Sequence, residues 1–322
     1  MIHHLPKLQH TFRHKIITRG PLHFPSHRLP PKLNHLYDIF TSQLHDDSEE
    51  QSAPNDSDPI FLAVDISVCE STKTVIEIGA AYMDSRYLRD DIDVHCHHLI
   101  QSHNYVIGLP IKSGLPESKL QSAICMWKRK QRRAASQFDY NARAVVPYNR
   151  LYQLLQRIFC HEYGTEQTHA CCRSKHFKIL RLDNERNTLT PPAETWRPLV
   201  IVGHGIRSDM DILRRLGFAL QAPVQYVDTM EIAKALRHFL RQREPKHGHS
   251  LRELCYGLGF RPTGWHVSGR DALFSMVALM KMAATMFEKD QSSKGRQTAS
   301  KLLHAIKNTD PLVHWEASRK AP

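Results

Sequence analysis

The sequence lacks both a long apolar run and a regular set of cysteines. No run approaches the roughly 18 apolar residues that a membrane-spanning helix requires, so the sequence excludes an integral membrane protein. The chain has 7 cysteines among 322 residues. Their odd number and wide scatter argue against a disulfide framework and favour a reducing compartment. Because no signal peptide is recognisable either, we expect a location in the cytoplasm or the nucleus.

The N-terminal region has two parts, of which the first lacks acidic residues and the second lacks Lys and Arg. Residues 1–37 contain Lys and Arg but no acid, whereas residues 38–58 contain acids but no Lys or Arg. Pro and His are frequent, and the apolar periodicity is poor. We therefore predict a disordered basic arm followed by an acidic linker over residues 1–58. An organelle presequence is the alternative interpretation of the basic part.

What the sequence does contain is enough apolar material for a core and an excess of positive charge. Hydrophobic residues make up 41% of the chain, and 44 Lys and Arg against 32 Asp and Glu give a net charge of +12. A basic protein of this kind is suited to nucleic acid, because Lys and Arg neutralise phosphates. The run Lys128–Arg133 is accordingly either a nucleic-acid contact and weak nuclear-import candidate or a solvated face.

From residue 59 the pattern is that of an α/β protein, with strands first and then strands alternating with helices. Buried strands are expected at 60–66, 74–82, 199–203 and 225–227. Helices are expected over 149–159, after the N-caps Ser208 and Ser250, and over 271–287. We predict one domain over residues 59–288, interrupted by an irregular basic insertion at about 101–147, and a mobile tail over residues 289–322.

Three acids stand where strands end or helices begin. Asp65 ends the first strand, Asp209 begins a helix, and Asp271 opens the last long helix five residues after His266. Carboxylates gathered in this way can hold two divalent cations about 4 Å apart that clamp a phosphodiester. A neutral His beside them can deprotonate the attacking water. Each acid alone also has a structural explanation, since helix N-termini favour acids, and Asp211 competes with Asp209.

Taken in order, these segments resemble the DEDDh 3′–5′ exonucleases, the histidine-type branch of the ribonuclease-H-like superfamily. The sequence most resembles a fungal exonuclease-like family typified by a C-terminal domain linked to mRNA-export factors. The resemblance covers about 59–100 and 198–288. The segments that carry it are Val64-Asp65, Val75–Gly79, Gly203–Leu213, Val227–Thr229 and His266-x4-Asp271.

The resemblance implies a fold, a cofactor and a substrate. The fold is α/β, with a ribonuclease-H-like mixed sheet of five strands flanked by helices. The cofactor is Mg²⁺ or Mn²⁺, and the partner is the single-stranded 3′ end of RNA or DNA. The resemblance further implies that Asp65 bridges both metals, Asp209 holds one and Asp271 the other. His266 would be the general base.

One position departs from the family pattern. The family has Asp-x-Glu on the first strand, whereas this chain reads Asp65-Ile66-Ser67. A hydroxyl is neutral and shorter than a carboxylate, and loss of even a group that only orients a metal ligand typically costs about 10–100-fold in affinity or activity. A water held by Ser67 is one compensation. Glu77 is another, although it belongs to the separate Ile-Glu-Ile-Gly motif, and Glu70 lies farther along the chain.

The sequence therefore supports two functions. One is a metal-dependent 3′–5′ exonuclease weakened by Ser67, and the other is a catalytically inactive adaptor of RNA metabolism that binds nucleic acid or a protein partner. Whether the chain is an enzyme stays open at this point.

Three further features have competing interpretations. Cysteines and histidines between Cys160 and His176 form either a zinc site or a loop with incidental thiols. Trp265 either stacks on a base or packs beneath the last helix. Asp228 matches a family acid, but we expect it to cap the turn with Thr229.

Overall fold

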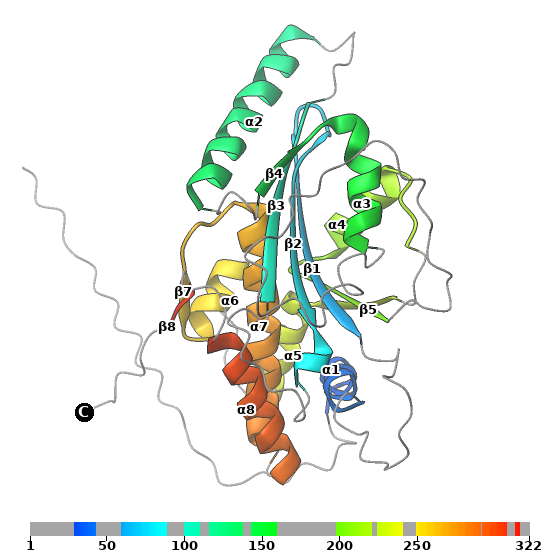
Figure 1. The fold of residues 1–322 in the computed structure, drawn as a ribbon. Helices are drawn as coiled ribbons and strands as arrows, with labels where there is room; N and C mark the ends of the chain where they lie inside the picture. The colour runs from blue at the N-terminus through cyan, green and yellow to red at the C-terminus, as the bar shows by residue number, and fades with distance from the viewer. Residues whose placement is uncertain are drawn as a thin grey trace, which may run out of the picture.

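The computed structural model describes residues 29–42, 59–88, 100–109, 116–137, 143–159, 198–220, 224–240, 249–290, 292–307 and 313–315. Figure 1 shows their arrangement. The helices are α1 (Pro31–Ser42), α2 (Glu117–Gln137), α3 (Leu151–Phe159), α4 (Arg207–Arg215), α5 (Thr229–Phe239), α6 (Leu251–Gly257), α7 (Ser268–Lys289) and α8 (Ser293–Lys307). The strands are β1 (Ile60–Val68), β2 (Val75–Asp84), β3 (Ile100–Ile107), β4 (Arg143–Val146), β5 (Leu199–Gly203), β6 (Val224–Asp228), β7 (Phe260–Pro262) and β8 (Val313–Trp315).

The main sheet is mixed, which confirms the α/β, ribonuclease-H-like class. Its strand order is β4-β3-β2-β1-β5-β6. β1 pairs antiparallel with β2 and parallel with β5, and β2 pairs antiparallel with β3. The described sheet has six strands rather than the expected five, because β4 adds a parallel strand beside β3. β7 and β8 form a separate antiparallel pair.

Alternation along β1 divides the core into two layers. Phe61 and Ala63 point to the face covered by α7, whereas Leu62 and Val64 point to the face covered by α3 and α4. All four side chains are buried. In Figure 1 the sheet accordingly stands between α7 on one side and α3 with α4 on the other. This two-sided burial explains why the strand is a continuous apolar run in the sequence.

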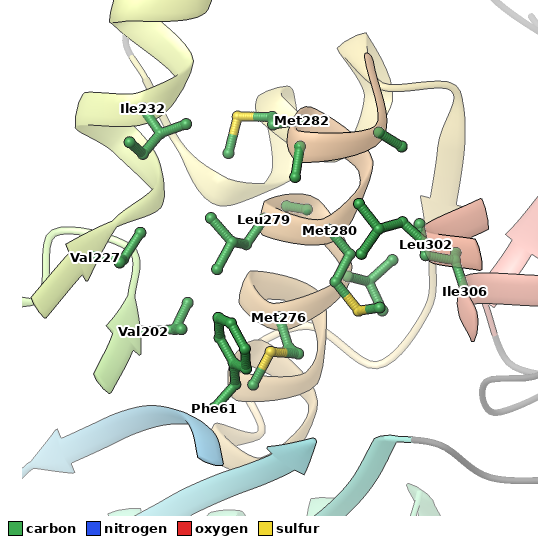
Figure 2. Close-up of a cluster of buried hydrophobic side chains, with 14 of the residues drawn as sticks. Phe61, Val202, Val227, Ile232, Met276, Leu279, Met280, Met282, Leu302 and Ile306 are labelled. Carbon is green, nitrogen blue, oxygen red and sulfur yellow. The ribbon is translucent and has the colours of Figure 1, made fainter. Parts of the chain in front are cut away.

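The layer on the α7 side is the larger one. Figure 2 shows Phe61, Val202 and Val227 of the strands meeting Met276 and Leu279 of α7. Buried side chains run along most of α7, which makes it the central helix of this layer. Among the described residues, no helix is long and apolar enough to cross a membrane.

Two expectations about the ends of the chain are wrong within the described residues. In the predicted disordered arm, residues 31–42 form α1, which buries Leu33, Leu36 and Phe40 against the α7 layer. In the predicted mobile tail, α8 packs on α7 and buries Leu302 and Ile306. Both segments have short apolar stripes at helical spacing, and burial of such a stripe against a preformed core outweighs a polar, Pro-rich context.

The predicted irregular insertion at 101–147 is also largely regular. It contains most of β3, the 21-residue helix α2 and β4. The buried or half-buried side of α2 presents Ala123, Trp127, Lys130 and Ala134. Their spacing of four, three and four residues is helical, so the basic run Lys128–Arg133 belongs to an amphipathic helix with one inward lysine.

The predicted helix starts had mixed outcomes. The Ser250 capping box is confirmed, since its hydroxyl accepts from Glu253 N–H and the Glu253 carboxylate accepts from Ser250 N–H. Ser208 is wrong as the N-cap of α4. Ile206 holds that position, and the Ser208 hydroxyl instead donates to the Gly205 carbonyl at 3.0 Å.

Candidate nuclease-like carboxylate site

The site begins on two adjacent strands that face the start of α7. Asp65 lies opposite Gly79 in the β1–β2 ladder, and Ser67 lies opposite Glu77. Because side chains alternate along a strand, these four residues share the face on which α7 lies. Two residues earlier on β1 that face is apolar, with Ala63 opposite Ala81. Along the α7 side of the β1–β2 ladder, the side chains therefore change from apolar to polar and acidic.

Gly79 allows the first turn of α7 to touch the sheet. A Cβ at this position would lie 1.9 Å from both the carbonyl carbon and the carbonyl oxygen of Ser268. No side chain fits at that distance, so the glycine of the Ile-Glu-Ile-Gly motif is needed for backbone contact rather than for conformational freedom. The close approach brings Ser268 beside the polar ladder pairs.

Glu77 is the buried centre of a polar network. Its carboxylate accepts from Asn104 Nδ2 at 2.9 Å and from the Ser268 hydroxyl at 3.3 Å. The Asn104 side-chain oxygen in turn accepts from Gly269 N–H at 2.8 Å. The Ser67 and Ser268 hydroxyl oxygens lie 2.9 Å apart. These contacts tie β1, β2, β3 and the N-terminus of α7 together through side chains.

Lys130 of α2 completes this network with a positive charge. Its ammonium nitrogen lies 2.6 Å from Glu77 Oε2, 3.0 Å from Ser67 Oγ and 2.8 Å from the His266 carbonyl oxygen. The Glu77 side chain is fully buried, and that of Lys130 is 13% exposed. An ammonium group has three N–H donors, so each donor has one oxygen partner in this arrangement.

Asp209 reaches the site from the opposite layer. β5 pairs with β1 only as far as Ala63, after which β5 turns into α4. The backbone N–H of Ile66 donates to Asp209 Oδ1 at 2.8 Å. Asp209 is 7% exposed, whereas Asp211 is 48% exposed at its side chain and forms an ion pair with Arg214. Of the two competing acids, Asp209 is therefore the one that faces β1.

Asp271 and His266 lie at the start of α7. The backbone N–H of His266 donates to the Asp271 carboxylate, while Asp271 Oδ1 is buried without a hydrogen-bond partner in the described residues. His266 adopts a φ of 67°, a conformation that favours glycine. Its carbonyl accepts from Lys130 and its N–H donates to Asp271, and the residue is exposed.

The three aspartates influence one another electrostatically. Burial, followed by repulsion from Asp65, raises the pKa of Asp209 to about 8 and that of Asp271 to about 8. Burial also raises the pKa of Asp65, against the opposing effects of the Ser268 hydroxyl and the Lys130 ammonium. Carboxylates in this arrangement disfavour simultaneous ionisation, which is typical of sites that bind cations or protons.

The donor set does not fit two divalent metals. Within the described part of the chain, no three or more His, Cys, Asp or Glu side chains are grouped so that they could hold a metal ion. The hydroxyl of Ser67 stands where the family has a carboxylate, and a cationic ammonium already contacts that hydroxyl. The raised pKa values show that the carboxyl groups influence one another, but together with the partnerless Asp271 oxygen they do not make a complete ligand set.

Two of the remaining features have structural roles. The Trp265 ring packs against Phe274 with centroids 4.9 Å apart, so the packing interpretation holds for the folded chain. Asp228 Oδ1 accepts from Met230 N–H at 2.9 Å and from Gly205 N–H at 3.0 Å, which confirms its capping role. The Cys and His cluster between Cys160 and His176 lies outside the described residues.

Sequence reasoning missed Lys130, Ser268 and Asn104. The spacing of Ala123, Trp127, Lys130 and Ala134 is a helical signal in the sequence. The exposed basic residues around Lys130 make this signal hard to recognise. Ser268 lies between His266 and Asp271, and its role became visible only once Gly79 brought α7 against β2. Asn104 gave no sequence signal, because its partners come from β2 and α7.

Comparison with known proteins supports the resemblance to exonucleases. A DEDDh family model, described as DNA polymerase III subunit epsilon-like, C-terminal domain, matches residues 135–282. This range is less than half of the chain. It contains Asp209, His266 and Asp271 but not Asp65 or Ser67. No curated protein matches the chain. The match supports an exonuclease-like domain with a nucleic-acid function.

Proposed function

We propose that this chain is an exonuclease-like protein that binds a single-stranded 3′ end of RNA or DNA and has weak or no two-metal hydrolysis. The observation that carries the proposal is the contact between the Lys130 ammonium and Ser67 Oγ at 3.0 Å. A nuclease of this family pattern would have a carboxylate at position 67. Here the same position carries a neutral hydroxyl that accepts from a cation.

The binding part of the proposal is supported by the outer face of α2. Lys128, Arg129, Arg132 and Arg133 are exposed, whereas Lys130 of the same helix extends into the carboxylate site. A phosphate chain lying along these four cations would therefore run beside the site. Phosphate contacts of this kind give affinity without sequence specificity.

On the sequence motifs alone, we extend the proposal to the fungal exonuclease-like branch linked to mRNA export. Its partners would then belong to RNA metabolism, in the cytoplasm or the nucleus. RNA and DNA remain equal candidates, since discrimination depends on contacts with the 2′-hydroxyl.

The test uses single-stranded RNA and DNA oligonucleotides, either linear with a free 3′ end or circular. Binding is measured by fluorescence anisotropy in EDTA, and trimming of labelled linear strands is followed in Mn²⁺ and then in Mg²⁺. Asp65→Ala and Asp271→Ala are measured beside the native chain.

We expect the native protein to prefer linear over circular strands and to trim them little. Equal, weak binding to both topologies would contradict the proposed 3′-end function. Rapid stepwise trimming that disappears in both aspartate variants would instead show a working three-acid nuclease.

A further inference from the structure

We propose that the Lys130 ammonium is a built-in cation that takes the place of one divalent metal ion in the carboxylate site. Its three oxygen partners come from three different segments: Glu77 on β2, Ser67 on β1 and the His266 carbonyl before α7. All three distances are 3.0 Å or less. The nitrogen is thus coordinated by a preformed oxygen set rather than extending into solvent.

The position of Lys130 also matches the position of the lost acid. Ser67 lies directly opposite Glu77 in the β1–β2 ladder, and the ammonium contacts both. A serine hydroxyl can accept a hydrogen bond from the ammonium without adding a second negative charge. Because one positive charge needs fewer carboxylates than two, loss of the acid at 67 and insertion of a lysine are mutually compatible changes.

The charge of Lys130 acts on the same acids that a metal would bind. The ammonium lowers the pKa of both Asp65 and Asp271, opposing the effect of burial. A divalent cation placed among the same oxygens would be repelled by the ammonium, since charges a few ångströms apart interact more strongly inside a protein than in water.

The fold of α2 fixes the lysine in this place. Ala123, Trp127 and Ala134 lie on the same inward face as Lys130, and Trp127 packs with Ala134 against Val106 and Val267. Lys119, on the first turn of the same helix, is exposed. The inward lysine is therefore set by helix packing, and Lys119 supplies a control with the same charge and helix.

The inference rests on the carboxylate site of the proposed function but not on its nucleic-acid ligand. Its test consequently uses Mn²⁺ alone and no oligonucleotide, so that it can fail while 3′-end binding stands, or hold while 3′-end binding fails.

The experiment measures Mn²⁺ binding to the full chain by electron paramagnetic resonance of free Mn²⁺. Five proteins are compared: the native chain, Lys130→Met, Ser67→Glu, the double variant Ser67→Glu/Lys130→Met, and the control Lys119→Met. Since loss of one metal-site group typically costs about 10–100-fold in affinity, we expect the double variant to bind Mn²⁺ at least about tenfold more tightly than the native chain. Ser67→Glu alone should gain little, because Lys130 would pair with the new carboxylate. Lys119→Met should match the native chain.

Two results would overturn the inference. One is tight Mn²⁺ binding by the native chain, equal to that of the double variant. The other is a folded double variant that binds Mn²⁺ no better than the native chain, since Lys130 would then be only a structural ion pair.

A second measurement decides the matter should the double variant not fold. Thermal unfolding of the native chain and of Lys130→Met is followed in EDTA and in MnCl₂. We expect Mn²⁺ to raise the Tm of Lys130→Met and to leave the native Tm unchanged. A rise of the native Tm as large as that of the variant would contradict a built-in cation.

Discussion

The two ends of the contact between α7 and the sheet use the same strands and the same face for opposite purposes. At one end, Phe61 lies opposite Met83 and Ala63 lies opposite Ala81, and these side chains are buried with the methionines of α7. Four residues farther along β1, the ladder pairs are Asp65 with Gly79 and Ser67 with Glu77. The apolar end stabilises the fold by burial, and it places the polar end at a fixed distance from α7.

The polar end is held in place by the rest of the fold rather than being favourable in itself. Buried carboxylates lose hydration, and their mutual repulsion adds to that cost. The energy that keeps them together comes from the apolar end and from the partners of Glu77. Changes at the two ends should therefore differ in their effects on stability, on pH dependence and on binding.

The largest stability effect is expected at the apolar end. Phe61 is fully buried and stacks on Phe40 with ring centroids 5.1 Å apart. Phe61→Ala should lower the free energy of unfolding by about 3–5 kcal/mol, because it removes buried surface and leaves a cavity. Urea unfolding measures this loss. Tyr226→Ala, at a side chain that is 50% exposed, is the control and should change stability by about 0.5 kcal/mol or less.

Breaking the buried ion pair should come next. Glu77→Gln keeps the shape of the side chain but leaves the Lys130 ammonium without its carboxylate partner. We expect a loss of about 3 kcal/mol, at the low end for removal of one partner of a buried pair. Glu231→Gln removes a half-buried acid that pairs with Lys32 and Lys234 near the surface, and its effect should stay below about 1 kcal/mol. Equal losses in the two variants would contradict the burial argument.

The close approach of α7 gives a smaller effect with a functional consequence. Gly79→Ala inserts a Cβ where the Ser268 backbone lies and should cost about 1–3 kcal/mol, as overpacking does. The displacement of Ser268 should also weaken binding to a 3′ end, measured by anisotropy. Gly257→Ala meets no atom within 4 Å, so it should leave both stability and binding close to native. A Gly79→Ala variant with native stability would contradict the close contact between Gly79 and the Ser268 backbone.

The last prediction concerns the pH dependence of stability. The folded-state pKa of Asp209 is raised from 3.8 to about 8, so the folded chain binds more protons than the unfolded chain between these values. Stability contributed by Asp209 is therefore present at low pH and lost as the pH rises toward 8. Asp209→Asn should flatten this fall in stability, because the amide does not titrate in this pH range. Thermal unfolding across this pH range measures the slope, and the exposed Asp211→Asn should leave it as in the native chain.

The elements that the sequence could predict are those whose signals are local. β5 is a continuous apolar run, β1 begins with one and α7 is mostly apolar. The Ser250 capping box is a four-residue pattern that appears unchanged in the structure. The three site aspartates were found through motif order, and the structure brings Asp209 and Asp271 under the electrostatic influence of Asp65.

What could not be predicted depends on contacts between distant segments. α1 has only a short apolar stripe, and its burial requires α5 and α7 to be already in place. Lys130 looked like one member of a solvated basic run, because nothing near it in the sequence shows that Glu77 would lie 2.6 Å away. Ser67 was recognised as a departure from the family pattern, but the group that contacts it came from a helix that the sequence did not predict.

The central claim is that Ser67 and Lys130 together separate this site from a two-metal nuclease. The most direct test measures the initial rate of 3′-nucleotide release from labelled single-stranded RNA in Mn²⁺, for the native chain, Ser67→Glu and Ser67→Glu/Lys130→Met. The account predicts rates near background for the native chain and for Ser67→Glu, and a clearly higher rate for the double variant. A native chain that trims as fast as the double variant would contradict it.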